Sequence, residues 1–253
     1  MLHIIYKPKG RALEYAPLAC NLYMGCTHGC KYCYAPGCVR RSLKDWKSLV
    51  VVRKDVVNLF EKDCKWLASH MPDDENRRVL FCFLSDPYQP LEGRMHITRK
   101  CLKSAKKHGI KVDILTKGSY ERVAKDLLLM KEAGVRLGVT LSFVDDSKRK
   151  EWELDAAPVA DRLQLLKTAH DMGISTWVSV EPVIDPDEAL GVIESAHAFV
   201  NRWKIGKLNY NKTIEQKVDW HKFYWDIRAI KKKYGLDMYI KKSLRSYSRL
   251  MCK

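Results

Sequence analysis

Long apolar segments are missing from this 253-residue chain. No run of about 18 apolar residues occurs, so we expect no membrane-spanning helix. Residues 1–10 contain no hydrophobic signal region, so we expect no secretion and a cytoplasmic location. Low-complexity stretches are also missing. The length fits one ordinary domain, and the 46% of hydrophobic residues suffices for a core.

An even set of cysteines is missing as well. The chain has nine cysteines, and three of them are gathered at positions 26, 30 and 33. A disulfide framework needs paired cysteines in an oxidising compartment, whereas clustered thiols fit a reducing one. We therefore expect these cysteines to serve as ligands rather than as cross-links.

Acidic residues are scarce relative to basic ones. The chain has 46 Lys and Arg against 30 Asp and Glu, a net charge of +16. Residues 228–253 alone carry nine basic side chains and one acidic side chain, interleaved with three tyrosines. Basic groups bind phosphates and aromatic rings stack on unpaired bases, so this pattern favours DNA, RNA or a nucleotide over a merely solvated basic surface. The predicted nucleic-acid contacts are Lys241, Lys242, Arg245 and Arg249.

A repeated helix–glycine–strand pattern organises most of the chain. Helix-like segments end in Gly109, Gly134, Gly173 and Gly235, each followed at once by an apolar run. Glycine just past a helix end adopts the left-handed cap. The predicted strands are 18–24, 79–84, 111–116, 136–143, 175–181, 199–208 and 237–240. The predicted helices are 55–69, 98–108, 120–133, 158–172, 187–197 and 218–234, with 33–47 read as a loop.

Alternating strands and helices of these lengths predict crossover units and a parallel sheet. The expected fold is α/β, a partial (β/α)6-type TIM barrel with a basic C-terminal segment. Residues 1–17 are expected to form a lead-in, 18–242 the barrel and 243–253 a basic tail. Chemistry in such folds lies at the carboxyl ends of the strands.

Three cysteines at C-x3-C-x2-C spacing follow the first predicted strand. Cys26, Cys30 and Cys33 can turn three thiolates toward one centre, as iron–sulfur clusters require. A [4Fe–4S] cluster held by three cysteines leaves one iron open for a ligand, by the logic of catalytic metal sites. Zinc is the rival metal, with His28 or Cys38 as its fourth ligand.

The run NLYMGCTHGCKYCYA at residues 21–35 resembles the signature of the radical SAM superfamily. It is most similar to the spore photoproduct lyase-related branch, whose members are often labelled DNA repair photolyases. The resemblance implies a [4Fe–4S] cluster whose open iron binds S-adenosylmethionine. It also implies reductive cleavage to a 5′-deoxyadenosyl radical, with electrons from a flavodoxin- or ferredoxin-type donor.

Polar residues at the predicted strand ends are the candidate cofactor contacts. Ser85 and Asp86 follow the second strand within a Ser-Asp-Pro-Tyr-Gln-Pro run, and Lys117 follows the third. The resemblance assigns these places to the methionine end of S-adenosylmethionine. A helix cap at Asp86 and an exposed ammonium at Lys117 are the structural alternatives. Glu181 is either a ligand or half of a buried ion pair. The full set is Tyr32, Ser85, Asp86, Lys117, Thr140, Ser142 and Glu181.

One residue departs from the pattern of spore photoproduct lyase. That enzyme has a hydrogen-donating cysteine three residues before the Asp of the second-strand motif, a place that Phe83 occupies here. The adjacent Cys82 should point to the other face of the strand, because successive side chains alternate. We therefore expect Cys82 to be buried core and only a weak candidate for a catalytic hydrogen donor. No other catalytic residue is assigned.

These features predict a radical SAM enzyme acting on a thymine-type base in DNA, either rearranging a modified thymine or repairing a lesion. The absent donor cysteine suits an isomerase, because an adenosyl radical can return the hydrogen that it removes. The chain also resembles radical SAM isomerases that act on hypermodified bacteriophage DNA. A phage protein of this kind would act in the cytoplasm of the host. The alternatives are a radical SAM enzyme on a small molecule or peptide, and a non-catalytic zinc or cluster module that binds nucleic acid.

Overall fold

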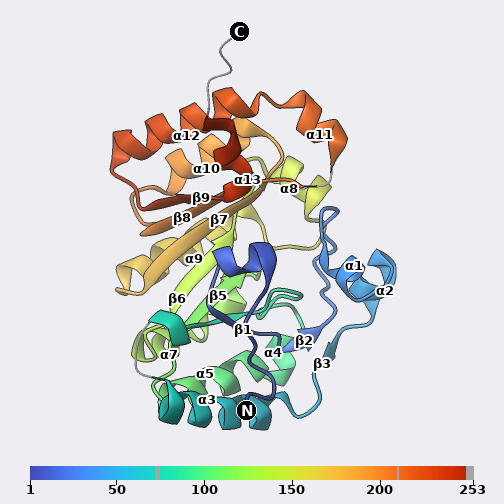
Figure 1. Ribbon diagram of the computed structural model, residues 1–253, viewed down its shortest axis with the longest axis vertical. Helices are drawn as coiled ribbons and strands as arrows, with labels where there is room; N and C mark the ends of the chain where they lie inside the picture. Colours follow the sequence, from blue (N-terminus) through green and yellow to red (C-terminus); the bar gives the residue numbers. More distant parts are fainter. Residues whose placement is uncertain (72–74, 210, 249–253) are drawn as a thin grey trace.

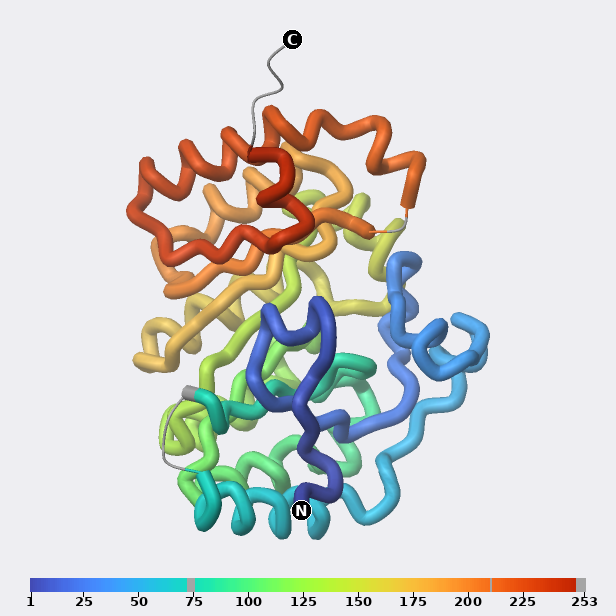
Figure 2. The backbone as a smooth tube through the Cα atoms, in the orientation of Figure 1, coloured from blue at the N-terminus to red at the C-terminus, as the bar shows by residue number. Residues whose placement is uncertain are grey.

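The computed structural model describes residues 1–71, 75–209 and 211–248 (Figures 1 and 2). Seven parallel strands form one sheet in the order β1-β4-β5-β6-β7-β8-β9. Within the described residues β1 and β9 do not pair, so the sheet is open. The α/β partial barrel is therefore confirmed. Its strands are β1 (Leu18–Cys20), β4 (Val79–Phe81), β5 (Val112–Thr116), β6 (Arg136–Thr140), β7 (Ser175–Val183), β8 (Arg202–Lys207) and β9 (Met238–Ile240).

The first predicted strand is interrupted at Asn21. The chain leaves the main sheet there, and β2 (Tyr23–Met24) pairs antiparallel with β3 (Val51–Val52) in a small second sheet. The side-chain oxygen of Asn21 accepts hydrogen bonds from the backbone amides of Phe83 and Leu84, at 2.9 and 3.0 Å. This amide side chain thus replaces the backbone pairing that would have continued the strand.

Most helices lie where the periodicity predicts them. All four glycines of the repeat have positive φ, with +66° at Gly109, +61° at Gly134, +78° at Gly173 and +63° at Gly235. The left-handed caps are therefore confirmed. The principal helices are α3 (Val56–His70), α5 (Ile97–Lys107), α6 (Tyr120–Ala124), α7 (Leu127–Glu132), α9 (Val159–Asp171), α10 (Pro186–Ala196) and α12 (Trp220–Tyr234).

Two predictions of local structure were wrong. The segment 33–47, predicted as a loop, falls largely into two short helices, and Ser42 caps the second of them by accepting from the amide of Asp45. The predicted helix 120–133 breaks into α6 and α7 at Asp126, whose buried carboxylate binds the hydroxyl of Tyr88 at 2.9 Å. The shorter helices are α1 (Ala35–Cys38), α2 (Leu43–Ser48), α4 (Glu92–Met95), α8 (Asp146–Trp152), α11 (Lys212–Lys217) and α13 (Lys242–Arg245), with 3-10 turns η1 (Gly10–Glu14), η2 (Glu75–Arg77) and η3 (Ser246–Ser248).

The two faces of the sheet bury different side chains. On β4, Val79 and Phe81 belong to the large core that the sheet shares with the helices. Leu80 instead packs in a small inner cluster with Ala16 and Trp177. This alternation follows from the two-residue period of a strand.

The lead-in packs into the barrel rather than preceding it. Figure 2 shows the dark blue N-terminal segment lying over the sheet. The amides of Ile4 and Ile5 donate to Asp63 of α3 at 2.7 and 2.8 Å. The ammonium of Lys204 on β8 donates to the carbonyls of Glu14 and Tyr15 at 3.0 and 2.7 Å. The start of the segment therefore packs against α3, and its end packs against the inner cluster of the sheet.

None of the helices in the described part of the chain is both long and apolar enough to cross a membrane. The predicted basic tail begins in α13 and η3. Arg249, one of the predicted nucleic-acid contacts, lies outside the described residues. The expected cytoplasmic location stays a prediction.

Candidate active site

The cysteine loop carries three unpaired thiols at the carboxyl edge of the sheet. Cys26, Cys30 and Cys33 are all free, with Cys30 buried and the other two partly exposed. Burial raises the pKa of the Cys30 thiol to about 11, while the ammonium of Lys117 opposes that rise. Each of the three thiols also lies within electrostatic reach of another. Three free thiols beside a cation fit a cluster that needs three thiolates.

Among the described residues, no three Cys, His, Asp or Glu side chains are gathered closely enough to hold a single metal ion. A [4Fe–4S] cluster makes a different demand, because each of the three thiolates ligates a separate iron.

Neighbouring segments fix the start of the loop. The amide of Cys26 donates to the carbonyl of Trp46 at 3.0 Å. The hydroxyl of Ser85 donates to the carbonyl of Gly25 at 2.5 Å, and Gln89 accepts from the amide of Thr27 at 3.3 Å. The predicted site residue Ser85 therefore holds the backbone of the cysteine loop.

His28 is buried inside the loop and has partners at both ring nitrogens. Its Nε2 lies 3.2 Å from the carboxylate of Asp86, and its Nδ1 lies 3.3 Å from the carbonyl of Asp155. A zinc ligand needs one ring nitrogen for the metal. The arrangement therefore disfavours His28 as the fourth ligand of a zinc site.

Asp86 joins the cysteine loop to two strand ends. Its carboxylate accepts from the amide of Tyr88 at 2.8 Å, from the hydroxyl of Thr116 at 2.6 Å and from the amide of Lys117 at 2.7 Å. Burial alone would raise the pKa of Asp86, but His28 and these donors hold it well below its usual range. Asp86 is thus ionised and occupied by protein groups.

A segment after α8 clamps the other side of the loop. The amide of Lys31 donates to the carbonyl of Trp152 at 2.9 Å, and the amide of Asp155 donates to the carbonyl of His28 at 3.0 Å. The hydroxyl of Tyr32 donates to the carboxylate of Glu153. This clamp connects the loop to a part of the chain more than a hundred residues away.

Glu153 was missed by the sequence reasoning. It forms an ion pair with Arg162 of α9 at 2.6 Å, and both side chains are 0% exposed. Arg162 also donates to the carbonyls of Thr140 and Ala157 at 2.8 and 2.9 Å. A signal existed, because Arg162 occupies an apolar-face position of the predicted helix 158–172, and a buried arginine requires a carboxylate partner.

Lys117 lies over the ring of Tyr32, with its ammonium 5.5 Å from the ring centre. Burial lowers the pKa of Lys117, but the nearby Cys30 and Glu153 raise it overall. The ammonium therefore stays charged beside the cysteine loop. The structure thus brings together Lys117 and Tyr32, two residues predicted separately from a strand end and from the cysteine motif.

The remaining predicted cofactor contacts divide into two groups. Thr140 and Ser142 are buried at the end of β6, and the hydroxyl of Ser142 has no hydrogen-bond partner. Glu181 instead pairs with Lys241 at 2.6 Å and accepts from the hydroxyl of Tyr15. It therefore adopts the ion-pair alternative.

The assignment of Lys241 to a nucleic-acid surface needs correction. Its side chain is 4% exposed, and its ammonium is turned inward to Glu181. An ammonium held in a buried ion pair is not free to neutralise a backbone phosphate. Among the described residues, Lys242 and Arg245 stay predicted contacts for nucleic acid.

Cys82 belongs to the outer core. It packs among the side chains shared with the helices and accepts the amide of Leu22 at 3.4 Å, whereas Phe83 packs against the inner cluster. Burial raises the pKa of the Cys82 thiol to about 12. The expected alternation of Cys82 and Phe83 is therefore confirmed.

An open parallel sheet with three free thiols after its first strand defines a cluster-binding α/β enzyme of the partial-barrel class. The model of the radical SAM superfamily matches residues 20–200, more than half of the chain. The chain belongs to the radical SAM superfamily, and its cofactors are S-adenosylmethionine and a [4Fe–4S] cluster.

Known proteins are similar to this chain in sequence or in fold. An uncharacterized protein of Methanocaldococcus jannaschii is 28% identical over 201 residues, covering 78% of this chain and 72% of that protein. Spore photoproduct lyase, in a structure with bound AdoMet and a dinucleoside spore photoproduct, is 16% identical with a TM-score of 0.63, over 89% of this chain and 76% of the lyase. SuiB of Streptococcus suis, bound to S-adenosylmethionine, is 12% identical with a TM-score of 0.63, over 91% of this chain and about half (51%) of SuiB. At these identities the two structures show a common fold.

Replacing Gly25 by alanine should weaken cluster binding. Gly25 has φ of +87°, and an added Cβ would lie 2.7 Å from the carbonyl oxygen of Leu49. We expect a loss of about 1–3 kcal/mol in stability, with a lower iron content after anaerobic reconstitution. Gly37→Ala is the matched control, because its Cβ meets nothing within 4 Å and its φ is not positive. Equal iron content in both variants would contradict the prediction.

Proposed function

We propose that this radical SAM enzyme acts on a thymine-type base in nucleic acid, as an isomerase or a lyase. The observation that carries the proposal is the loop of three free thiols at the carboxyl edge of the sheet. The ammonium of Lys117 lies over the ring of Tyr32 within this loop. Support for a nucleic-acid substrate comes from the net charge of +16 and from the fold shared with a lyase that binds a dinucleoside lesion.

The residues of the site have distinct proposed roles. When bound, the cluster and S-adenosylmethionine supply a carbon radical that removes a hydrogen atom from the substrate. The three cysteines hold the cluster, and the ammonium of Lys117 pairs with the cofactor carboxylate. Ser142 offers its unpartnered hydroxyl to the ribose. Ser85 keeps the cysteine loop in position, because its hydroxyl donates to the carbonyl of Gly25. Asp86 keeps the backbone of Lys117 in position, because its carboxylate accepts from the Lys117 amide.

The position of Cys82 favours rearrangement over lesion repair. Its thiol lies in the outer core, while the inner face at this strand carries Phe83. An isomerase needs no protein thiol there, because the hydrogen removed from the substrate can be returned to it. A base within a duplex would first have to be flipped out or single-stranded.

A peptide is the second candidate substrate. SuiB, which shares this fold, has been determined bound to its precursor peptide SuiA, with a TM-score of 0.54 to this chain. The excess of positive charge would then serve an acidic peptide. A flavodoxin- or ferredoxin-type electron donor remains part of either proposal.

Cofactor cleavage in the presence of nucleic acid tests the substrate class. The reconstituted, reduced enzyme should form 5′-deoxyadenosine several-fold faster with thymine-containing single-stranded DNA than without it, because substrate completes the site. Mass spectrometry of the digested nucleosides should show a changed base.

Polyphosphate is the matched control, since it carries phosphate charge without bases. Equal cleavage with and without DNA, together with unchanged nucleosides, would refute the nucleic-acid substrate. Absence of 5′-deoxyadenosine under every condition would refute the enzymatic role itself.

A further inference from the structure

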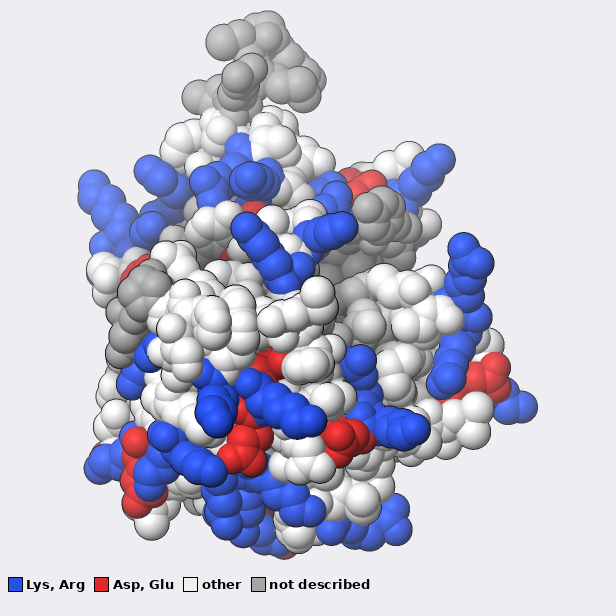
Figure 3. All heavy atoms as spheres, turned by 60° about the horizontal axis from the view of Figure 1, so that its bottom comes forward, with Lys and Arg blue, Asp and Glu red and all other residues white. Residues whose placement is uncertain are grey.

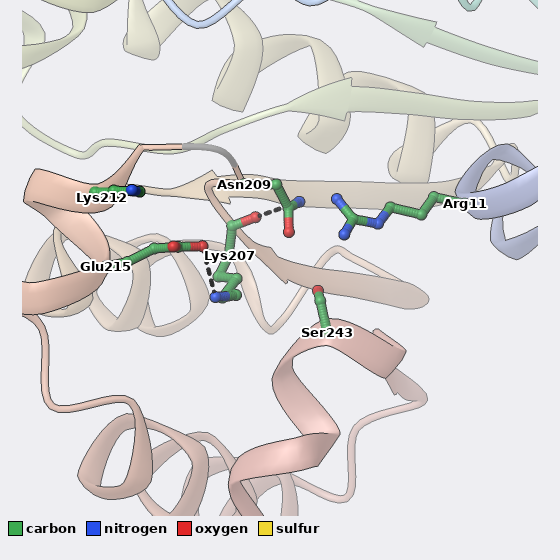
Figure 4. Close-up of a pocket in the computed structure, with 6 residues that line it drawn as sticks. All are labelled: Arg11, Lys207, Asn209, Lys212, Glu215 and Ser243. Carbon is green, nitrogen blue, oxygen red and sulfur yellow. Dashed lines mark hydrogen bonds and ion pairs between the residues drawn. The ribbon is translucent and has the colours of Figure 1, made fainter.

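A basic cavity opens beyond the carboxyl end of β8. Its volume is about 520 Å³, and side chains from η1, β8, α11 and α13 surround it (Figure 4). Because all strands of the sheet are parallel, the end of β8 lies at the same edge as the cysteine loop after β1. The lining residues are Arg11, Lys207, Asn209, Lys212, Glu215 and Ser243.

Positive charge predominates in this cavity. Glu215 is the one carboxylate among the lining residues, and it is paired with Lys207 at 2.8 Å. Lys207 is also fixed by the ring of Tyr247, 5.4 Å from its ammonium. With Arg11, Lys207 and Lys212 against Glu215, the lining residues carry a net positive charge.

A second basic cavity lies beside α13. Its volume is about 460 Å³, and it is lined by Lys242, Arg245, Ser246 and Ser248, with no acidic residue in that lining. The guanidinium of Arg245 lies 4.7 Å from the ring centre of Tyr239, which restricts its position. Ser243 of the same helix lines the first cavity, so α13 contributes to both.

Glu14 holds the two cavities in a fixed relation. Its carboxylate accepts from the amide of Lys242 and from the hydroxyl of Tyr239, both at 2.9 Å. Glu14 belongs to η1, the same turn that carries Arg11. The N-terminal turn, which contributes Arg11 to the first cavity, is therefore joined to α13, which lines both cavities.

Overall charge does not locate this surface. Figure 3 shows Lys and Arg spread over the face in view, and in its lower half they are mixed with acidic residues. The two cavities differ because cations from separate segments gather around open hollows, together with serine hydroxyls and the Asn209 amide. Such donors match phosphate oxygens, and two neighbouring cavities match a chain with several phosphates better than a single carboxylate.

We infer that these two cavities form one phosphate-binding surface, which holds the backbone of a nucleic-acid strand while its base lies beside the cofactor site. The inference rests on the proposed function. It adds Arg11, Lys212 and Ser243 as substrate-binding residues and gives the N-terminal turn a part in recognition.

Salt-dependent binding of a short fluorescein-labelled oligothymidylate tests the inference. For single strands, each lost phosphate contact should reduce the slope of log affinity against log salt by about 0.7. We expect Arg11→Ala with Lys212→Ala, and separately Lys242→Ala with Arg245→Ala, to lower the slope by about 1.4 each. Lys212→Ala alone, at an exposed position, should lower it by about 0.7 and does not depend on tolerance of the core.

Lys106→Ala with Lys107→Ala on α5 is the matched control. It removes the same charge from exposed pairs with Glu132 and Glu61, away from both cavities. Slopes that fall equally in this control and in the cavity variants would overturn the inference. Loss of binding to phosphatidylserine vesicles, with oligothymidylate binding intact in the variants, would overturn it in favour of a membrane surface. If the wild-type protein neither binds nor alters nucleic acid, the proposed function itself fails.

Discussion

Alanine at Cys26, Cys30 or Cys33 should abolish bound iron, acid-labile sulfide and formation of 5′-deoxyadenosine together. Each substitution removes one of three thiolates, and the described residues near the loop offer no ready replacement, because His28 is held by Asp86 and Asp155. A cluster without its third ligand is lost rather than weakened. The visible absorbance of the reconstituted protein, iron and sulfide assays, and cofactor cleavage measure the loss.

Cys38→Ala is the matched control for these three variants. Cys38 is exposed in α1, five residues beyond the last cysteine of the motif. We expect it to retain iron and activity at the wild-type level. If Cys38→Ala lost the metal as completely as the other three, the site would have four cysteine ligands and no open iron, which would contradict the three-cysteine cluster. Iron and activity retained in all three motif variants would contradict the cluster outright.

Replacing Glu153 by alanine should give the largest loss of stability, about 3–5 kcal/mol. The substitution leaves Arg162 charged, fully buried and still bonded only to carbonyl groups of Thr140 and Ala157. Removing one partner of a buried pair strands the other charge in a poorly solvating interior. For a chain of this size the thermal midpoint should fall by roughly 6–20 °C.

The Glu153 variant should also disturb the cysteine loop. Tyr32 loses the acceptor of its hydroxyl, so the electronic absorption or EPR spectrum of the reduced cluster should change. Asp171→Ala is the control, because it breaks an exposed pair with Lys167 that contributes only about 0.5 kcal/mol. A fall in the thermal midpoint no greater than that of the control would contradict the prediction.

Segments that are distant in the sequence hold the cysteine loop in place. Asp86 connects it to the ends of β4 and β5, and the segment after α8 holds its other side through Glu153 and Asp155. The functional consequence is that residues without any contact to a cofactor can control the geometry of the three thiols.

Some features of this protein were determined by the sequence alone. The four glycine caps followed from local backbone chemistry, because only glycine adopts positive φ without strain. Four of the strands followed from the apolar runs directly after those caps, namely β5, β6, β7 and β9. The spacing of the three cysteines within one short loop predicted an iron–sulfur cluster. Each of these signals acts over a few residues, and for that reason it can be read without the fold.

The tertiary structure decided which strand-end groups meet. In the folded chain Glu181 forms an ion pair with Lys241, and the carboxylate of Asp86 lies beside the ring of His28. The hydroxyl of Tyr32 donates to Glu153. It also placed the N-terminal turn beside the C-terminal helix α13. Such contacts depend on strand register, sheet curvature and side-chain direction. A shift of one residue along a strand moves a side chain to the opposite face of the sheet, as the neighbours Cys82 and Phe83 show. Partners separated by more than a hundred residues leave no local pattern, so only the folded chain reveals them.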